Sequence, residues 1–419
     1  MSHPGAGAHE NPGARLMRRL DALARFSSEP DALTRLYLTP EHTAAAAVVG
    51  DWMRAAGMRV RMDAAGTVAG RYEGEQPQAP ALLLGSHIDT VRNAGRYDGN
   101  FGVVAAIEAV DALSQRGERR PFAIEVLAFG DEEGVRFPVT LTGSRAIAGS
   151  FRPLTLEAVD RDGISLRAAM LRFGLDPAAI AALARNRRDT LGYVEAHIEQ
   201  GPVLEAENLP VGVVTAISGA SRFVVTIGGI AGHAGTVPMA MRKDALAAAA
   251  EMVLCTEACA LRTPGLVATV GQIAARPGAV NVIAGQVEFS LDVRSARDGD
   301  RTAAASWLAT AFEAIARRRG VSLAIAKSYD EAAALCDPAL MAALEASVTR
   351  MGAPVRRLPS GAGHDGLAMQ ALCPIAMLFV RCKGGISHNP DELISAGDAA
   401  IAVGVLTDFL RSFVPPAAP

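Results

Sequence analysis

Apolar residues recur along this chain at the spacings of helices and strands. From about Ala14 to Gly57 they return every three or four positions, and the same spacing returns from about Gly102 to Arg116, which predicts helices in both segments. Buried strands are predicted where short apolar runs occur: Val60–Met62, Ala81–Gly85, Ile124–Phe129, Tyr193–His197 and Ile375–Arg381. Strands that alternate with helices indicate an α/β fold in which helices cover a central sheet.

The middle of the chain has a different order of elements. Strands are predicted at Val211–Ser218, Arg222–Gly229, Leu266–Ile273, Gln286–Val293 and Ser322–Ala326, with helices at Met241–Ala260 and Arg301–Arg319. This order predicts a smaller α+β domain at 211–327, in which about four antiparallel strands are backed by two helices. Residues 1–210 and 328–419 would then form one catalytic domain around the insertion, with hinges at Glu207–Pro210 and Lys327–Glu331.

Length, charge and cysteine content narrow the class of protein. A chain of 419 residues is long enough for two domains. A net charge of -3 offers no basic face for nucleic acid. The five cysteines form no paired pattern, which favours reduced thiols in the cytoplasm. Neither a signal peptide nor an apolar run long enough to cross a bilayer is found, so no membrane role is expected.

Several predicted strands are followed by side chains that bind metal ions. His87 follows the run Ala81–Leu84, Asp131-Glu132-Glu133 follow Ile124–Phe129, His197 ends its strand, and His388 comes after the last strand. Because open α/β sheets bind ligands at the carboxyl ends of their strands, these groups are expected to meet. Imidazoles and carboxylates suit zinc, manganese or cobalt, and the lack of nearby cysteine argues against a structural zinc. Asp89, two residues after His87, is expected to orient that imidazole.

These motifs resemble those of a known family. They are Gly85-Ser86-His87-Ile88-Asp89, Tyr97-Asp98-Gly99, Asp131-Glu132-Glu133, Glu195-Ala196-His197 and Ile386-Ser387-His388-Asn389. From about residue 15 to 412 the chain is similar to the hydantoinase/carbamoylase branch of the M20 metallopeptidase-like amidohydrolases. That branch includes N-carbamoyl-L-amino-acid hydrolases, β-ureidopropionases and allantoate amidohydrolases. Histidine at position 197, where peptidase branches usually have a carboxylate, selects this branch.

The resemblance implies a fold, a metal site and a catalytic base. It implies a di-metal aminopeptidase-like α/β/α catalytic domain with an inserted lid. Asp98 would bridge two divalent ions, zinc or manganese, with cobalt or nickel as alternatives. His87 and His197 would complete one metal, and Glu133 and His388 the other. The bridging water would become a hydroxide near neutral pH, and Glu132 would serve as general base.

Further groups are expected to bind the substrate. His233, between glycines in Gly232-His233-Ala234-Gly235, is a candidate oxyanion donor. The resemblance implies that this histidine reaches the active site of a partner subunit, in a homodimer formed through the inserted domain. Arg294 is suited to grip a carboxylate with two hydrogen bonds. Asn281 and Gln200 offer amides, and the family implies that all three residues bind substrate.

The expected reaction is hydrolysis of a ureido C–N bond, releasing ammonia and carbon dioxide. The motifs favour allantoate as substrate, followed by an N-carbamoyl-L-amino acid, and both carry a carboxylate for Arg294. An aminopeptidase or N-acyl-amino-acid deacylase is the alternative within the superfamily. A non-catalytic binding protein with the same fold is a third hypothesis, which the presence of Glu132 and of all five candidate ligands disfavours.

Overall fold

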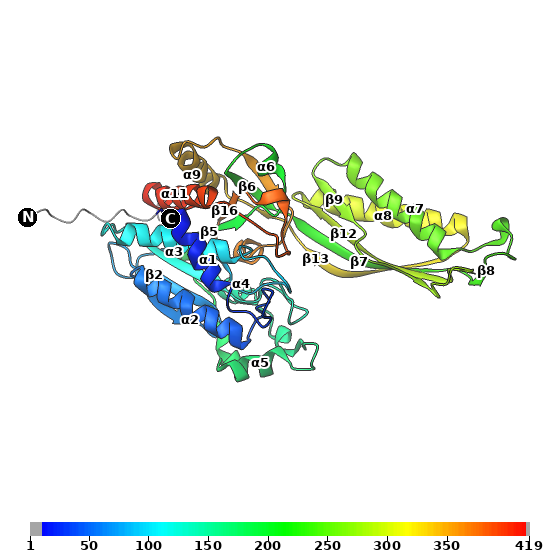
Figure 1. Ribbon diagram of the computed structural model, residues 1–419, viewed down its shortest axis with the longest axis horizontal. Coiled ribbons are helices and arrows are strands. Elements are labelled where there is room, and N and C mark those ends of the chain that lie inside the picture. Colours follow the sequence, from blue (N-terminus) through cyan, green and yellow to red (C-terminus); the bar gives the residue numbers. More distant parts are fainter. Residues whose placement is uncertain (1–10, 416–419) are drawn as a thin grey trace, which may run out of the picture. The chain divides into compact units, whose positions relative to one another are not determined.

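A large mixed sheet organises the first part of the chain in the computed structural model, which describes residues 11–415 (Figure 1). The neighbouring strands run in the order β1-β2-β4-β3-β5-β16-β6. Their bounds are β1 (Arg59–Met62), β2 (Val68–Tyr72), β3 (Ala81–His87), β4 (Ala123–Phe129), β5 (Thr190–Ile198), β6 (Val211–Ile217) and β16 (Ile375–Val380). Strands β4, β3, β5 and β16 are mutually parallel, whereas β2 and β6 pair antiparallel to their neighbours in this block. The carboxyl ends of the parallel strands therefore lie at one edge of the sheet.

Helices cover this sheet and pack against one another. Their bounds are α1 (Pro12–Leu23), α2 (Pro40–Ala55), α3 (Asn100–Ser114), α4 (Thr142–Ile147), α5 (Leu166–Phe173), α6 (Val203–Ala206), α9 (Pro338–Arg350), α10 (Gly366–Met369) and α11 (Ala396–Ser412). Helix α3 is buried along nearly its whole length because it contacts β3, β4 and β5 as well as α1 and α11. Thr39 begins α2 by accepting a hydrogen bond from the His42 N–H, with Pro40 at the first helical position.

A second antiparallel sheet forms around the middle of the chain. It has the order β10-β12-β7-β13, and β9 also pairs with β12. The bounds are β7 (Gly219–Gly228), β9 (Leu266–Thr269), β10 (Ile273–Arg276), β12 (Gln286–Ser295) and β13 (Ser322–Glu331), with helices α7 (Ala245–Arg262) and α8 (Asp298–Arg319). Figure 1 shows α7 and α8 side by side along this sheet. Phe289 and Leu291 of β12 are buried among helix residues such as Phe312, while the alternate residues of the strand are more exposed.

Short strands complete the fold. They are β8 (Gly232–His233), β11 (Val282–Ile283), β14 (Ala334–Leu335) and β15 (Arg357–Ser360). Contacts divide the described chain into two units: residues 11–215, 336–358 and 364–415, and residues 216–335 with 359–363. The predicted roles of these parts, as catalytic domain and lid, stay predictions. None of the helices within residues 11–415 is both long and apolar enough to cross a membrane.

The mixed α/β class is confirmed, and several predicted boundaries are wrong. Residues 211–214 of β6 pair with β16 in the large sheet, so the run Val211–Ser218 is not a strand of the smaller sheet. Leu266–Ile273 is divided between β9 and β10, which gives five strands in that sheet instead of four. The proposed hinge at Lys327–Glu331 lies inside β13, whereas the helical pattern predicted from about 14 to 57 forms the two helices α1 and α2, separated at 24–39.

Candidate metal centre

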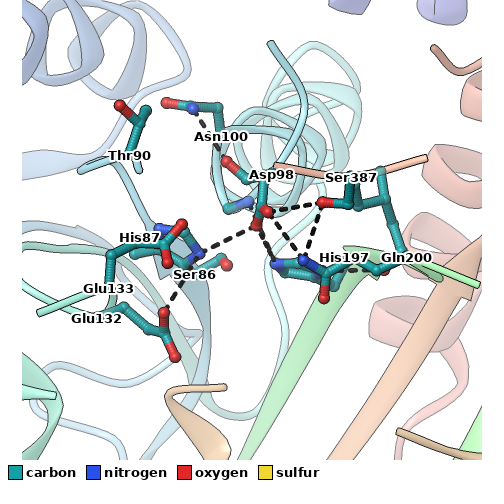
Figure 2. Close-up of polar contacts among 12 residues, drawn as sticks. Ser86, His87, Thr90, Asp98, Asn100, Glu132, Glu133, His197, Gln200 and Ser387 are labelled. Carbon is teal, nitrogen blue, oxygen red and sulfur yellow. Dashed lines mark hydrogen bonds and ion pairs between the residues drawn. The ribbon is translucent and has the colours of Figure 1, made fainter. Parts of the chain in front are cut away.

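The predicted ligands of the first unit meet at the carboxyl ends of its parallel strands (Figure 2). His87 is the last residue of β3 and pairs with Phe129, the last residue of β4. The segment 131–133 follows β4 directly, and His197 lies near the end of β5, opposite Phe379 of β16. The common direction of these strands brings together side chains that are far apart in sequence.

Asp98 lies at the centre of this cluster. Its Oδ1 is 3.5 Å from His87 Nε2 and 3.2 Å from His197 Nε2, and its Oδ2 is 3.3 Å from His388 Nε2. Two groups of candidate ligands share this carboxylate: His87, Asp98 and His197, and Asp98, Glu133 and His388. Within each group the ligand atoms lie within 4.8 Å of one another. This arrangement fits two divalent cations that share one carboxylate.

The orientation of the buried imidazoles suits metal binding. His87 Nδ1 lies 3.0 Å from the Asp89 carbonyl oxygen, and His197 Nδ1 lies 2.9 Å from the Ile198 carbonyl oxygen. Because a carbonyl oxygen only accepts hydrogen bonds, each Nδ1 carries the proton. The Nε2 atoms, which face Asp98, are therefore the ring nitrogens that would coordinate a cation there, each as a neutral histidine ligand.

The backbone around the cluster adopts unusual conformations. Gly99, directly after Asp98, has a φ of 65°, and a Cβ at this position would lie 2.4 Å from the His87 ring. Asp131, Gln200 and His388 also have positive φ, with values of 67°, 55° and 55°. Residues other than glycine are rarely held there, and such strain concentrates at functional sites.

Charges in the cluster shift one another's pKa values. Burial opposes the ionisation of Asp98, but the imidazoles of His197, His388 and His87 outweigh it and hold the pKa of this carboxyl well below its ordinary value. Burial, together with the charge of Asp98, raises the pKa of Glu133 to about 7. Glu133 Oε1 is also buried without a hydrogen-bond partner among the described residues. An acceptor left unsatisfied in this position is consistent with a ligand to a cation.

Glu132 lies beside the two ligand groups. Its Oε2 is 4.0 Å from His87 Nε2, and it forms a third close group with His87 and Glu133. Burial raises the pKa of Glu132 well above its ordinary value, and the neighbouring Glu133 adds to this effect while His87 opposes it. A carboxylate with a raised pKa accepts protons readily, which is the property of a general base.

Asp89 contacts the cluster differently from the sequence prediction. Its backbone oxygen, not its carboxylate, accepts the hydrogen bond from His87, since Asp89 Oδ1 is 3.6 Å from His87 Nδ1. The carboxylate instead accepts the backbone N–H groups of Glu132, at 3.1 Å, and Glu133, at 3.2 Å. Asp89 therefore fixes the turn that carries both glutamates.

Gln200 lies next to Asp98. Ser387 and Glu392 also lie there, and neither was among the site residues predicted from the sequence. Gln200 Nε2 donates to Asp98 Oδ2 at 2.8 Å and to Ser387 Oγ at 3.1 Å. Glu392 accepts the backbone N–H of Asp98 at 3.1 Å, and its other oxygen accepts the Ser387 hydroxyl at 3.0 Å. The sequence offered one weak signal for Glu392, its position four residues after His388, but the exposed Asp391 has almost the same position.

The remaining predicted residues lie in the second unit. His233, on β8, is exposed, and its Nδ1 accepts the Gly235 N–H at 3.1 Å. The Asn281 carbonyl oxygen accepts the Ala234 N–H at 2.9 Å, so Asn281 lies beside the His233 turn. Arg242 donates to the carbonyl oxygens of Ala234 and Val237 and so holds this turn closed. Arg294 lies on β12 of the same unit.

Comparison with known proteins identifies the family. The profile of the peptidase family M20/M25/M40 matches residues 83–412, a range that includes His87, Asp98, Glu132, Glu133, His197 and His388. This chain belongs to the M20/M25/M40 family.

Similar members of the family are named as an amidohydrolase, a deiminase and an amidase. An N-carbamoyl-L-amino acid amidohydrolase from Geobacillus stearothermophilus is 43% identical over 395 residues, covering 94% of this chain and 97% of that protein. Allantoate deiminase 1 from Glycine max is 39% identical over 427 residues, covering 94% of this chain and 88% of that protein. The crystal structure of an amidase of the hydantoinase/carbamoylase family from Burkholderia multivorans superposes with a TM-score of 0.90 at 32% identity, covering 95% of this chain and 97% of that one. The predicted branch of the M20 family is therefore confirmed.

Proposed function

We propose that this M20 protein is a metal-dependent amidohydrolase that cleaves the ureido C–N bond of allantoate or of an N-carbamoyl-L-amino acid. The observation that carries the proposal is the sharing of Asp98 by two ligand groups, with Glu132 beside them. The names of relatives at 43% and 39% identity support the ureido class of substrate.

The donor set supports two divalent ions. His87 and His197 would hold one ion with Asp98, and Glu133 and His388 would hold the other. Nitrogen and carboxylate donors suit zinc or manganese, with cobalt or nickel as alternatives. Bound there, the ions would polarise the ureido carbonyl and lower the pKa of a water molecule. Asp89, by accepting the N–H groups of Glu132 and Glu133, keeps base and ligand in place.

Glu132 then moves the proton that hydrolysis requires. Its carboxylate takes a proton from the water that attacks the ureido carbon and returns it to the leaving nitrogen. The C–N bond breaks and ammonia leaves with that proton; the remaining carbamic acid, which keeps the second proton of the water, transfers it to its nitrogen and loses carbon dioxide to give an amine.

We assign recognition of the substrate to four polar residues. Gln200 has a buried Oε1 without a partner among the described residues, so an acceptor for a ureido N–H is available beside Asp98. In the second unit Arg294 would bind the substrate carboxylate, Asn281 would bind a ureido or carboxylate group, and His233 would donate to the oxyanion. Because the His233 turn is exposed, we assign it to the active site of a partner subunit in a homodimer. The five free cysteines support the reducing cytoplasm as its location.

Ammonia release tests the reaction class. Purified protein loaded with manganese or zinc is offered allantoate, a panel of N-carbamoyl-L-amino acids, dipeptides and N-acetyl amino acids. Turnover of a ureido acid that is abolished by a chelator and restored by metal is expected, and the preferred compound separates allantoate from carbamoyl amino acids. Protein that holds two metals yet hydrolyses only peptides or N-acetyl compounds would overturn the proposal in favour of a peptidase or deacylase.

A further inference from the structure

An acid is held between two arginines on the sheet of the second unit. Asp292 of β12 lies opposite Arg222 of β7, and Arg294 is two residues further along β12, hence on the same face. Arg294 Nε donates to Asp292 Oδ1 at 2.8 Å, and Arg294 Nη2 donates to Oδ2 at 3.0 Å. Arg222 Nε donates to the same Oδ2 at 3.0 Å. One carboxylate thus orders both guanidinium groups.

These contacts decide which hydrogen-bond donors of Arg294 remain available. A guanidinium has five N–H groups, one on Nε and two on each terminal nitrogen. Asp292 uses Nε and one N–H of Nη2, and the Gly361 carbonyl oxygen uses one N–H of Nη1 at 2.8 Å. One N–H on each terminal nitrogen is left to donate to a second acceptor such as a carboxylate.

The surroundings fit a second carboxylate. A cavity of about 670 Å³ is lined by Arg222, Asp292 and Arg294 together with the polar side chains of Gln272 and Ser290. Two arginines and one aspartate leave a single positive charge in this cavity. Arg222 is itself braced, because its guanidinium carbon lies 4.8 Å from the centre of the Tyr329 ring.

We propose that Asp292 is a positioning residue that fixes the guanidinium plane of Arg294 for the carboxylate of the substrate. The proposal rests on the proposed function, in which Arg294 binds that carboxylate. Without Asp292 the long arginine side chain would regain rotational freedom, and its Nε edge would compete for the substrate with the terminal edge. Binding would then have to order the side chain, which weakens affinity for the acid group.

The test compares an acid substrate with its uncharged analogue. Wild type and Asp292→Asn are assayed with the ureido acid that the wild type prefers and with the primary amide of that acid. We expect Asp292→Asn to raise KM for the acid about tenfold while kcat changes less than about threefold, as for the loss of one charge-assisted hydrogen bond. On the amide, kcat/KM should change less than about twofold, because this substrate does not use the ordered guanidinium.

Two further variants separate positioning from general damage. Glu251→Gln removes an acid that also pairs with two arginines, Arg318 and Arg319, in the same unit, and should leave both substrates unaffected. If Asp292→Asn does not fold, Asp292→Glu retains the charge but displaces the guanidinium, and should weaken only the acid substrate.

Three results would overturn the proposal. An equal loss on acid and amide would show a merely structural role, and unchanged kinetics on the acid would show that Arg294 needs no positioning. A metal-loaded wild type that hydrolyses no ureido acid would overturn the proposed function together with this inference, whereas either of the other results leaves the proposed function standing.

Discussion

The central residues of the metal centre in the first unit and the residues of the His233 turn in the second unit differ in burial and in their hydrogen-bond partners. His87, Asp98 and His197 are at most 3% exposed, and they hydrogen-bond mainly to one another and to neighbouring backbone. His233 and Asn281 are exposed, and each contacts its own turn. Buried polar groups must satisfy one another, so the residues of the metal centre should depend on one another, whereas His233 and Asn281 should be removable one at a time.

Backbone strain follows the same division. Positive φ angles at residues other than glycine occur in the first region at Asp131, Gln200 and His388. Among the described residues of the second unit, positive φ occurs only at glycines: Gly265, Gly278 and Gly320. Strained backbone persists only where its surroundings hold it firmly, so the ligand geometry of the first region is largely set by the fold.

Removal of Asp98 should have the largest effect of any single change. Asp98→Asn takes away the charge that both ligand groups share, so we expect fewer than one bound metal per chain. Activity should fall by about 10⁴-fold, since several kcal/mol of transition-state stabilisation depend on the ions. Metal content by atomic spectroscopy and ammonia release measure this. Asp391→Asn, an exposed acid three residues after His388, is the control, and two metals retained by Asp98→Asn would contradict the shared-carboxylate assignment.

Substitutions of the adjacent residues Glu132 and Glu133 should impair different properties, the first catalysis and the second metal binding. Glu132→Gln should lower kcat by about 10³-fold, the usual contribution of a general base, with both metals still bound. Glu133→Gln should instead lose the metal that it shares with His388. Parallel measurements of kcat and metal stoichiometry distinguish the two. Full activity in Glu132→Gln would remove the base assignment, and equal metal loss in both variants would show that Glu132 is also a ligand.

In the second region, a substitution of Arg294 should impair substrate binding and leave metal binding intact. Arg294→Gln removes a bidentate charged contact, so KM for a ureido acid should rise about 30-fold, or about 2 kcal/mol. Metal content and kcat should stay near the wild-type values, because the metal ligands all belong to the other unit. Steady-state kinetics on the acid and its amide, with metal analysis, provide the check. Loss of metal in this variant would break the proposed independence of the two regions.

The sequence predicted the metal centre better than the boundaries around it. His87 and Glu133 could be predicted because each comes at or just after the end of a short apolar run, and parallel strands deliver such residues to one edge. Glu392 could not be predicted, because its contact with the site depends on a turn that brings its carboxylate back to the Asp98 backbone N–H. The run Val211–Ser218 was assigned to the wrong sheet because a strand buried on both faces shows no alternation that identifies its partners. Asp292 and Arg294 lie two residues apart in a predicted strand, so the sequence indicates that their side chains lie on the same face of the sheet. The sequence does not indicate that the two side chains pair with each other.

The smallest expected effects are on stability. They compare the loss of a buried acid, Glu108, with the loss of a surface acid, Glu251. Glu108 in α3 is fully buried and accepts hydrogen bonds from Arg15 at 2.6 Å and from Arg19 at 2.7 Å. Glu108→Gln leaves two partly buried arginines poorly compensated and should lower the free energy of unfolding by about 2 kcal/mol. Glu251 pairs with Arg319 on the surface of α7 and α8, where solvent screens the charges, so Glu251→Gln should cost less than about 1 kcal/mol. Urea unfolding of both variants measures the difference. Equal losses would mean that burial does not set the strength of ion pairs in this protein, and the contrast between the two regions would then have to rest on metal binding alone.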